Sequence, residues 1–297
     1  MFRNPHLQLH LCVLLWGFTA ILGKVITLSA IPLVFWRVLI VSFCLCLWLP
    51  VWRQLAGLTR RDIGIAAVNG VVITVHWLCF YGAVKMANAS VAATCLALAP
   101  IFLALFGPLL QRKRFVARDL LVAVIALPGV ALVVGGIPHD MRGGFALGAL
   151  AALLAALFSS INQGLAQRMP ALALTHIQMS SGALLLGLTI PFWPLAGINF
   201  AWPQPTDLGW LLVLALACTL VPFALIVVVL RRISAFGVQL AVNLEPVYAI
   251  ALAALLLGEG AELRWPFYVG VALIVGAVLG YVALHRRSSS LRDPLIG

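Results

Sequence analysis

A stripe of polar and aromatic side chains follows one face of the apolar segment 62–84. At about 100° per residue in a helix, its members fall on one side of the segment. They are Asn69, Ile73, His76, Trp77, Phe80 and Tyr81. Amide, imidazole, indole and phenol groups are costly against lipid, so this face should contact protein or water. The stripe predicts one wall of a cavity in which aromatic faces stack on a small molecule and polar edges orient it.

The same stripe also has a purely structural explanation. Trp77 and Tyr81 would then belong to the aromatic belt at the membrane interface, and His76 would bond to a neighbouring helix. We favour the cavity, because His76 and Asn69 lie too deep in the segment for a belt.

A second polar face lies on the apolar segment 143–166 and the residue that follows it. Ser159, Gln163 and Gln167 recur every four residues, so they share one side of a helix. Small polar residues also hold membrane helices together, which explains the serine without a substrate. Asn162 and Gln163 are larger and harder to satisfy by packing alone, so we predict that both line the cavity.

The segment 234–257 is more polar than its counterpart in the first half of the chain. Gln239, Asn243 and Glu245 stand where the positions 146 residues earlier are alanines. Glu245 is the one acidic residue well inside an apolar segment, and an intramembrane carboxylate is a functional hypothesis by default. It could bind a cationic amine, or carry a proton whose binding alternates with that of the substrate. The structural alternative, a partner for Arg37 or for a backbone group, stays open.

The elements that carry these side chains are predicted to be membrane-spanning helices. The chain has 297 residues, of which 64% are hydrophobic and 9% charged, whereas a soluble domain has about 45–50% apolar and about 25% charged residues. This composition argues against a soluble enzyme, a disordered protein or a nucleic-acid binder. The net charge of +11 is instead typical of a membrane protein with basic cytoplasmic loops.

Ten apolar stretches are each long enough to cross a bilayer, which takes about 20 residues. They cover 7–28, 32–52, 62–84, 88–110, 116–136, 143–166, 171–193, 207–230, 234–257 and 265–285. The predicted fold class is therefore an all-α integral membrane protein with ten transmembrane helices. With the N-terminus in the cytoplasm, 14 of the 19 basic residues fall on the cytoplasmic side. This excess predicts that both termini are cytoplasmic. We expect the membrane to be the inner (plasma) membrane of a bacterium.

The two halves of the chain resemble each other. Asp62-Ile63-Gly64 recurs as Asp207-Leu208-Gly209, and Pro100 recurs as Pro246. We therefore predict two repeats, residues 1–138 and 139–297. Each holds five spans, an odd number, so the second repeat must be inverted in the membrane. Inverted repeats are typical of secondary transporters that bind substrate near the middle of the bilayer.

The chain also resembles the EamA family of the drug/metabolite transporter superfamily. The resemblance lies in Leu244-Glu245-Pro246-Val247-Tyr248, in Leu256-Leu257-Gly258-Glu259, and in Trp16-Gly17 with Lys24 and Arg37. It covers nearly the whole chain and implies a transporter of small metabolites, in a family that includes exporters of aromatic and other amino acids. One departure is Lys113, which stands in the first repeat where the second has Glu259.

We therefore predict a secondary transporter that exports small metabolites, amino acids and aromatic ones in particular, by alternating access. The predicted substrate-binding residues are Trp16, His76, Trp77, Phe80, Tyr81, Phe158, Asn162, Gln163, Gln239, Asn243 and Tyr248, with Glu245 as coupling candidate and Phe223 as a further nearby aromatic. No cofactor, metal or nucleic acid is expected, and the partners are a small-molecule substrate and membrane lipid.

Two alternatives to a coupled exporter remain. One is an uncoupled uniporter or channel. The other is an intramembrane enzyme, in which His76 and Ser159 could meet, although no nucleophile motif surrounds the serine. The coupling ion, the transport direction and the oligomeric state stay open.

Overall fold

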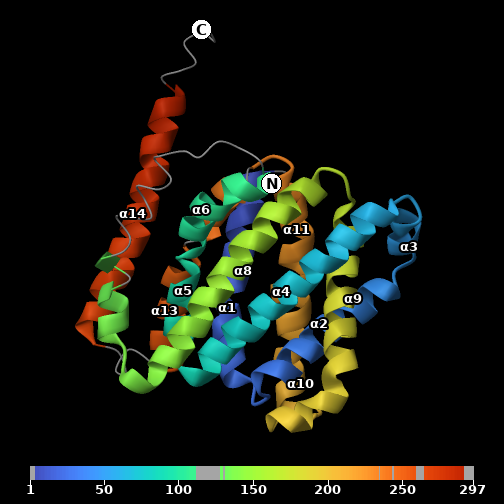
Figure 1. Ribbon diagram of the computed structural model, residues 1–297, viewed down its shortest axis with the longest axis horizontal. Helices are drawn as coiled ribbons and strands as arrows, with labels where there is room; N and C mark the ends of the chain where they lie inside the picture. Colours follow the sequence, from blue (N-terminus) through green and yellow to red (C-terminus); the bar gives the residue numbers. More distant parts are fainter. Residues whose placement is uncertain are drawn as a thin grey trace.

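The computed structural model describes residues 4–111, 128–129, 131–233, 235–242, 244–258 and 264–290, and its regular elements there are helices (Figure 1). Those of the first half are α1 (Pro5–Val25), α2 (Ala30–Cys46), α3 (Leu49–Leu55), α4 (Arg60–Met86), α5 (Ala89–Leu96) and α6 (Ala99–Gln111). Those of the second half are η1 (His139–Met141), α8 (Arg142–Ala166), α9 (Ala171–Thr189), η2 (Ile190–Ala196), α10 (Pro205–Leu212), η3 (Val213–Leu220), α11 (Val221–Leu230), α12 (Ala235–Val242), α13 (Glu245–Leu256) and α14 (Trp265–Ser290). Most of the predicted segment 116–136 lies outside the described residues.

The described helices include several with the length and hydropathy needed to cross a membrane. They are Pro5–Val25, Arg60–Met86, His139–Ala166, Ala171–Leu195 and Pro205–Leu230, and α2 with α3 forms a sixth candidate if that bent pair is one span. The protein is therefore a multi-pass, all-helical membrane protein over the described part of the chain. The count of ten spans and the inversion of the second half stay predictions.

The predicted span 32–52 is bent. α2 ends at Cys46, and the chain turns by 88° into the short helix α3. Pro50 is the second residue of α3. A proline fits the first turn of a helix but not its interior, because it has no N–H and its ring clashes with the preceding turn. The chain therefore restarts a helix at Pro50 instead of continuing α2.

Two other predicted spans are broken at corresponding places. The segment 88–110 divides into α5 and α6, and the segment 234–257 divides into α12 and α13. Pro100 and Pro246 are the second residues of the two new helices. Since a proline favours a helix start over a helix interior, both spans stop just before it and begin again.

The helices of the two halves begin at matching intervals. α5 and α12 begin 146 residues apart, as do α6 and α13, and α2 and α9 begin 141 residues apart. α4 and α10 begin 145 residues apart, which is also the spacing of the Asp-Ile-Gly and Asp-Leu-Gly motifs. Figure 1 shows α4 running obliquely between α8 and α9, with which it packs, and α14 at one edge.

Glycines let α4 approach α9 closely. A Cβ atom at Gly70 would collide with the main chain of Gln178 and with the side chain of Ser181, and one at Gly182 would collide with Thr74. Small residues at such crossings are the main packing device of membrane helices. The close crossing matters for the site, because α4 carries the predicted stripe.

Replacing Gly70 with Ala tests this packing. The added methyl group overlaps main-chain atoms of α9, so the two helices must separate. We expect the free energy of unfolding to fall by about 1–3 kcal/mol. The measurement is the unfolding midpoint in detergent, followed by tryptophan fluorescence.

The matched control is Gly64→Ala on the same helix, where a Cβ meets nothing within 4 Å. Its midpoint should stay the same or rise slightly, because alanine favours helix more than glycine does. Equal midpoints for the two variants would contradict the close crossing.

Candidate functional site

A cavity of about 90 Å³ lies between helices of both halves of the chain. At about 10–15 Å³ per water molecule, it holds several waters or a small organic group. It is lined by Trp16, Thr19, Arg37, Ile73, His76, Trp77, Phe80, Leu96, Ala155, Phe158, Ser159, Asn162, Phe223, Ile226, Leu230, Val238, Val242 and Glu245. The helices α1, α2, α4 and α5 contribute from the first half, and α8, α11, α12 and α13 from the second.

Aromatic rings form much of the cavity wall around Phe223. Its ring centroid lies 5.2 Å from that of Trp77, 5.7 Å from that of Phe158 and 6.4 Å from that of Trp16. These rings come from α1, α4, α8 and α11, so no single helix could supply the wall. Offset and edge-on rings of this kind present flat apolar surface to a bound molecule.

His76 both lines the cavity and bonds to a neighbouring helix. Its Nδ1 lies 2.7 Å from the main-chain oxygen of Ala151 on α8. A carbonyl oxygen can only accept, so Nδ1 donates this hydrogen bond. The imidazole ring stacks on Phe80 with an interplanar angle of 16°. The bond fixes the orientation of the ring. His76 therefore both lines a cavity and bonds to a neighbouring helix, so the two roles that the sequence suggested are compatible.

Arg37 is the principal charged group of the cavity that the predicted site omitted. Its side chain lies within α2 and is 1% exposed. The Nε atom donates to Thr219 Oγ1 at 2.6 Å, and Nη1 donates to the hydroxyl of Tyr81 at 2.9 Å. The guanidinium carbon lies 3.9 Å from the ring centroid of Trp77, a cation–π contact. The sequence did contain a signal for this role, because Arg37 lies inside the apolar segment 32–52, where a charge is costly. The count of basic residues treated it in the same way as residues in loops.

The fold explains how Thr219 reaches Arg37. Residues 213–220 form a π-helix, in which the Thr219 hydroxyl donates to the carbonyl of Leu214 at 2.7 Å. Such wider turns inside α-helices are rare and concentrate at functional sites. Thr219 Oγ1 thus accepts from Arg37 while it donates to its own helix.

Glu245 lines the same cavity as Arg37 but belongs to the second half of the chain, whereas Arg37 belongs to the first. It is buried and is the first residue of α13, where the helix restarts after the break. The positive end of a helix dipole at this position favours a carboxylate. Glu245 and Arg37 both line the cavity, and within the described residues no ion pair joins them.

A cluster of three buried amides adjoins the cavity. Asn162 Oδ1 accepts from Gln178 Nε2 at 2.8 Å and from Asn69 Nδ2 at 3.4 Å. Within the described residues, the Nδ2 of Asn162 and the Oδ1 of Asn69 have no hydrogen-bond partner. Asn162 also lines the cavity, so this cluster connects α4, α8 and α9 beside it.

The structure brings together only some of the predicted substrate-binding residues. Those that line the cavity are Trp16, His76, Trp77, Phe80, Phe158, Asn162 and Glu245. Tyr81 lies behind the wall, fully buried, with its hydroxyl on Arg37. Gln163 does not line the cavity, and Tyr248 is 40% exposed away from it. Asn243 and the side chain of Gln239 lie outside the described residues.

Known proteins share both the sequence pattern and the fold. The EamA-like transporter family model matches residues 5–135 and again residues 142–283. An uncharacterized transporter, YetK of Bacillus subtilis (strain 168), is 23% identical over 254 residues, which cover 82% of this chain and 75% of the relative. A crystal structure with 18% sequence identity superposes with a TM-score of 0.66, covering 95% of this chain and 98% of the other, and it shares the fold.

The family match spans nearly the whole chain and agrees with the resemblance seen in the sequence motifs. Together with the helices of membrane-spanning length, it leads to one conclusion: the chain belongs to the EamA-like transporter family.

Proposed function

We propose that this transporter exports small metabolites, namely amino acids with flat, apolar side chains, by alternating access. The observation that carries the proposal is the aromatic cavity, because its wall is assembled from both halves of the chain. A relative movement of the halves would therefore change which side of the membrane the cavity faces. The rings of Trp77, Phe158 and Phe223 offer stacking surface for an aromatic side chain.

Three observations support two inverted repeats as the moving parts. The helix starts recur at nearly constant intervals, and the break before Pro100 recurs before Pro246. The family model also matches the chain twice, once in each half. Helices broken beside the binding site are typical of transporters with inverted repeats. In this protein α12 ends and α13 begins at the cavity, since Val242 and Glu245 both line it.

The distribution of basic residues supports a cytoplasmic location for both termini in a bacterial plasma membrane. At one end of the bundle, Arg231 donates to the carbonyls of Ala166 and Met169 at 2.9 and 2.8 Å. Arg168 pairs with Asp62 at the same end. An excess of arginine at one end is expected for the cytoplasmic side.

Glu245 is proposed as the group that couples transport to a proton gradient. It is a buried carboxylate in the cavity, and a carboxylate there is costly unless it has a partner. Binding of a proton would relieve that cost when no cationic group is bound. Substrate and proton would then occupy the same carboxylate in turn.

Uptake of labelled phenylalanine into proteoliposomes tests the proposed function. We expect the reconstituted protein to accumulate phenylalanine above equilibrium when a pH gradient is imposed. Glu245→Gln should let phenylalanine equilibrate without accumulation, because the glutamine cannot exchange a proton.

The control is Asp140→Asn, which removes an exposed carboxylate and should leave accumulation unchanged. Failure of the wild-type protein to take up phenylalanine would contradict the proposed substrate class. Uptake that ignores the gradient in every protein would indicate an uncoupled uniporter instead.

A further inference from the structure

We propose that Arg37 and Glu245 together select zwitterionic amino acids, with Arg37 binding the carboxylate and Glu245 the ammonium group. The inference rests on the proposed function and names the groups of the substrate that the cavity recognises. Its starting point is a charged cavity whose two ionic groups do not contact each other.

Two of the three guanidinium nitrogens of Arg37, Nε and Nη1, donate hydrogen bonds that fix its position. Nε and Nη1 donate to Thr219 and Tyr81, and the Trp77 ring covers the planar face. In the described structure Nη2 donates no hydrogen bond. All the direct partners are neutral, so the buried positive charge lacks an anion in contact. A substrate carboxylate would supply that anion and accept from the free nitrogen.

Glu245 supplies the opposite charge from the other half of the chain. Its carboxylate lies in the same cavity and makes no direct ion pair with Arg37. An amino acid carries its carboxylate and ammonium on one carbon, so it can bridge the two groups. Its side chain would then lie against the aromatic wall around Phe223.

Competition against labelled phenylalanine uptake tests this recognition. The competitors are phenylalanine methyl ester, which lacks the carboxylate, and 3-phenylpropionate, which lacks the ammonium group. Each loses one hydrogen-bonded charge, so we expect each to compete roughly 10- to 100-fold more weakly than phenylalanine with the wild-type protein. Arg37→Gln should remove the discrimination against the ester alone, and Glu245→Gln the discrimination against phenylpropionate alone.

Two further variants keep the test independent of folding defects. Thr219→Val retains Arg37 but removes one of its anchors, so it should lower the discrimination against the ester and leave that against phenylpropionate unchanged. Arg53→Gln, at an exposed position, should change neither. An ester that competes as well as phenylalanine with the wild type would overturn the inference while phenylalanine transport stands. Wild-type protein without phenylalanine uptake would overturn the proposed function and this inference together.

An aspartate at each end of the bundle joins the two halves of the chain. At one end, Asp207 accepts from the main-chain N–H of Thr27 at 3.1 and 3.3 Å, and from its hydroxyl at 2.6 Å. Asp207 is 2% exposed. This contact joins the first turn of α10 to the connection that follows α1, so it links the two halves of the chain.

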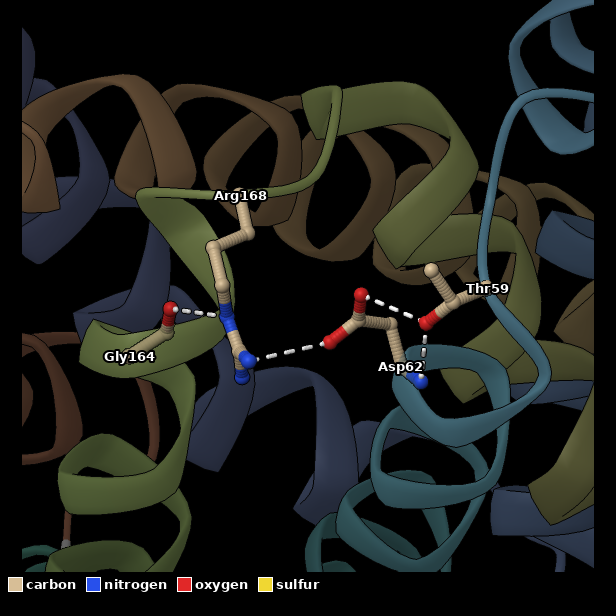
Figure 2. Close-up of polar contacts among 4 residues, drawn as sticks. All are labelled: Thr59, Asp62, Gly164 and Arg168. Atoms are coloured by element: carbon tan, nitrogen blue, oxygen red, sulfur yellow. Dashed lines mark hydrogen bonds and ion pairs between the residues drawn. The ribbon is translucent and has the colours of Figure 1, made fainter.

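At the other end, Asp62 makes the corresponding contact. Figure 2 shows Arg168, just after α8, reaching Asp62 in the first turn of α4 at 3.2 Å. Asp62 also accepts from the Thr59 hydroxyl, which caps the same helix. The side chains of Arg168 and Asp62 are 51% and 15% exposed. Thr27 is exposed, as Arg168 is, so the two contacts differ in their acids, of which Asp207 is the more deeply buried.

The two contacts are equivalent by position in the repeats. Asp62 and Asp207 both lie in the first turn of the helix, and Thr27 and Arg168 both lie two residues beyond the preceding helix end. The cavity extends toward the Asp62–Arg168 contact, since Leu230 lines it and accepts from Gln167 Nε2 beside Arg168. We infer that the two contacts are alternating latches, each of which holds its own end shut and must break before that end can open.

Hydrogen–deuterium exchange of the full-length protein in nanodiscs tests the latches. Asp207→Asn should raise exchange roughly tenfold in residues 24–30 and lower it in residues 58–63 and 166–170, because opening one end closes the other. Thr27→Val, which removes only the hydroxyl bond, should give the same pattern more weakly. Asp140→Asn should leave exchange at both ends unchanged. A rise confined to residues 24–30, or a rise at both ends, would overturn the inference.

Discussion

The centre of this protein is organised around a positive charge that the apolar bundle must satisfy. A guanidinium buried without partners is strongly destabilising, and more so where lipid surrounds the bundle. Arg37 avoids this cost through neutral groups drawn from two other helices: the Tyr81 hydroxyl and Trp77 ring from α4, and the Thr219 hydroxyl from the π-helical turn. The position of α2 against α4 and η3 follows from these contacts.

The acidic group of the cavity, Glu245, lies where a predicted span is interrupted. Because α12 stops and α13 restarts at Glu245, the carboxylate meets the positive end of a new helix inside the bundle. In the first half, a helix likewise begins at Ala99, 146 residues earlier, so a helix break occurs at both positions but a charge at only one of them.

The sequence predicted well what depends on continuous apolar runs and on helical periodicity. Of the stripe on α4, His76, Trp77 and Phe80 line a cavity, while their role in substrate binding stays a prediction. Asp62 and Asp207 were recognised as repeated positions, but their contacts were not, because a contact between halves depends on how the helices pack. Arg37 was named in the family motif and as a possible partner of Glu245 but was left out of the predicted site, because charge counting cannot separate a loop cation from one folded into the interior.

One helical face can have more than one neighbour, so residues that share a face need not line the same cavity. Tyr81 lies one helical turn after Trp77 on the same face of α4. Its hydroxyl accepts a hydrogen bond from Arg37 and does not line the cavity. Gln163 and Gln167 share a side of α8 with Ser159, but Gln167 donates to the carbonyl of Leu230 and Gln163 lies outside the cavity lining. Periodicity identifies a face, whereas the neighbour of each residue on that face is decided by tertiary packing.

The most direct measurement is an experimental structure of the full-length protein with phenylalanine bound at saturating concentration. If Arg37 and Glu245 recognise the amino acid, ligand density will lie between Trp77 and Phe223. The carboxylate will then lie within hydrogen-bond distance of Arg37, and the ammonium group will face Glu245. Phenylalanine bound elsewhere, or Arg37 turned away from the ligand, would contradict it.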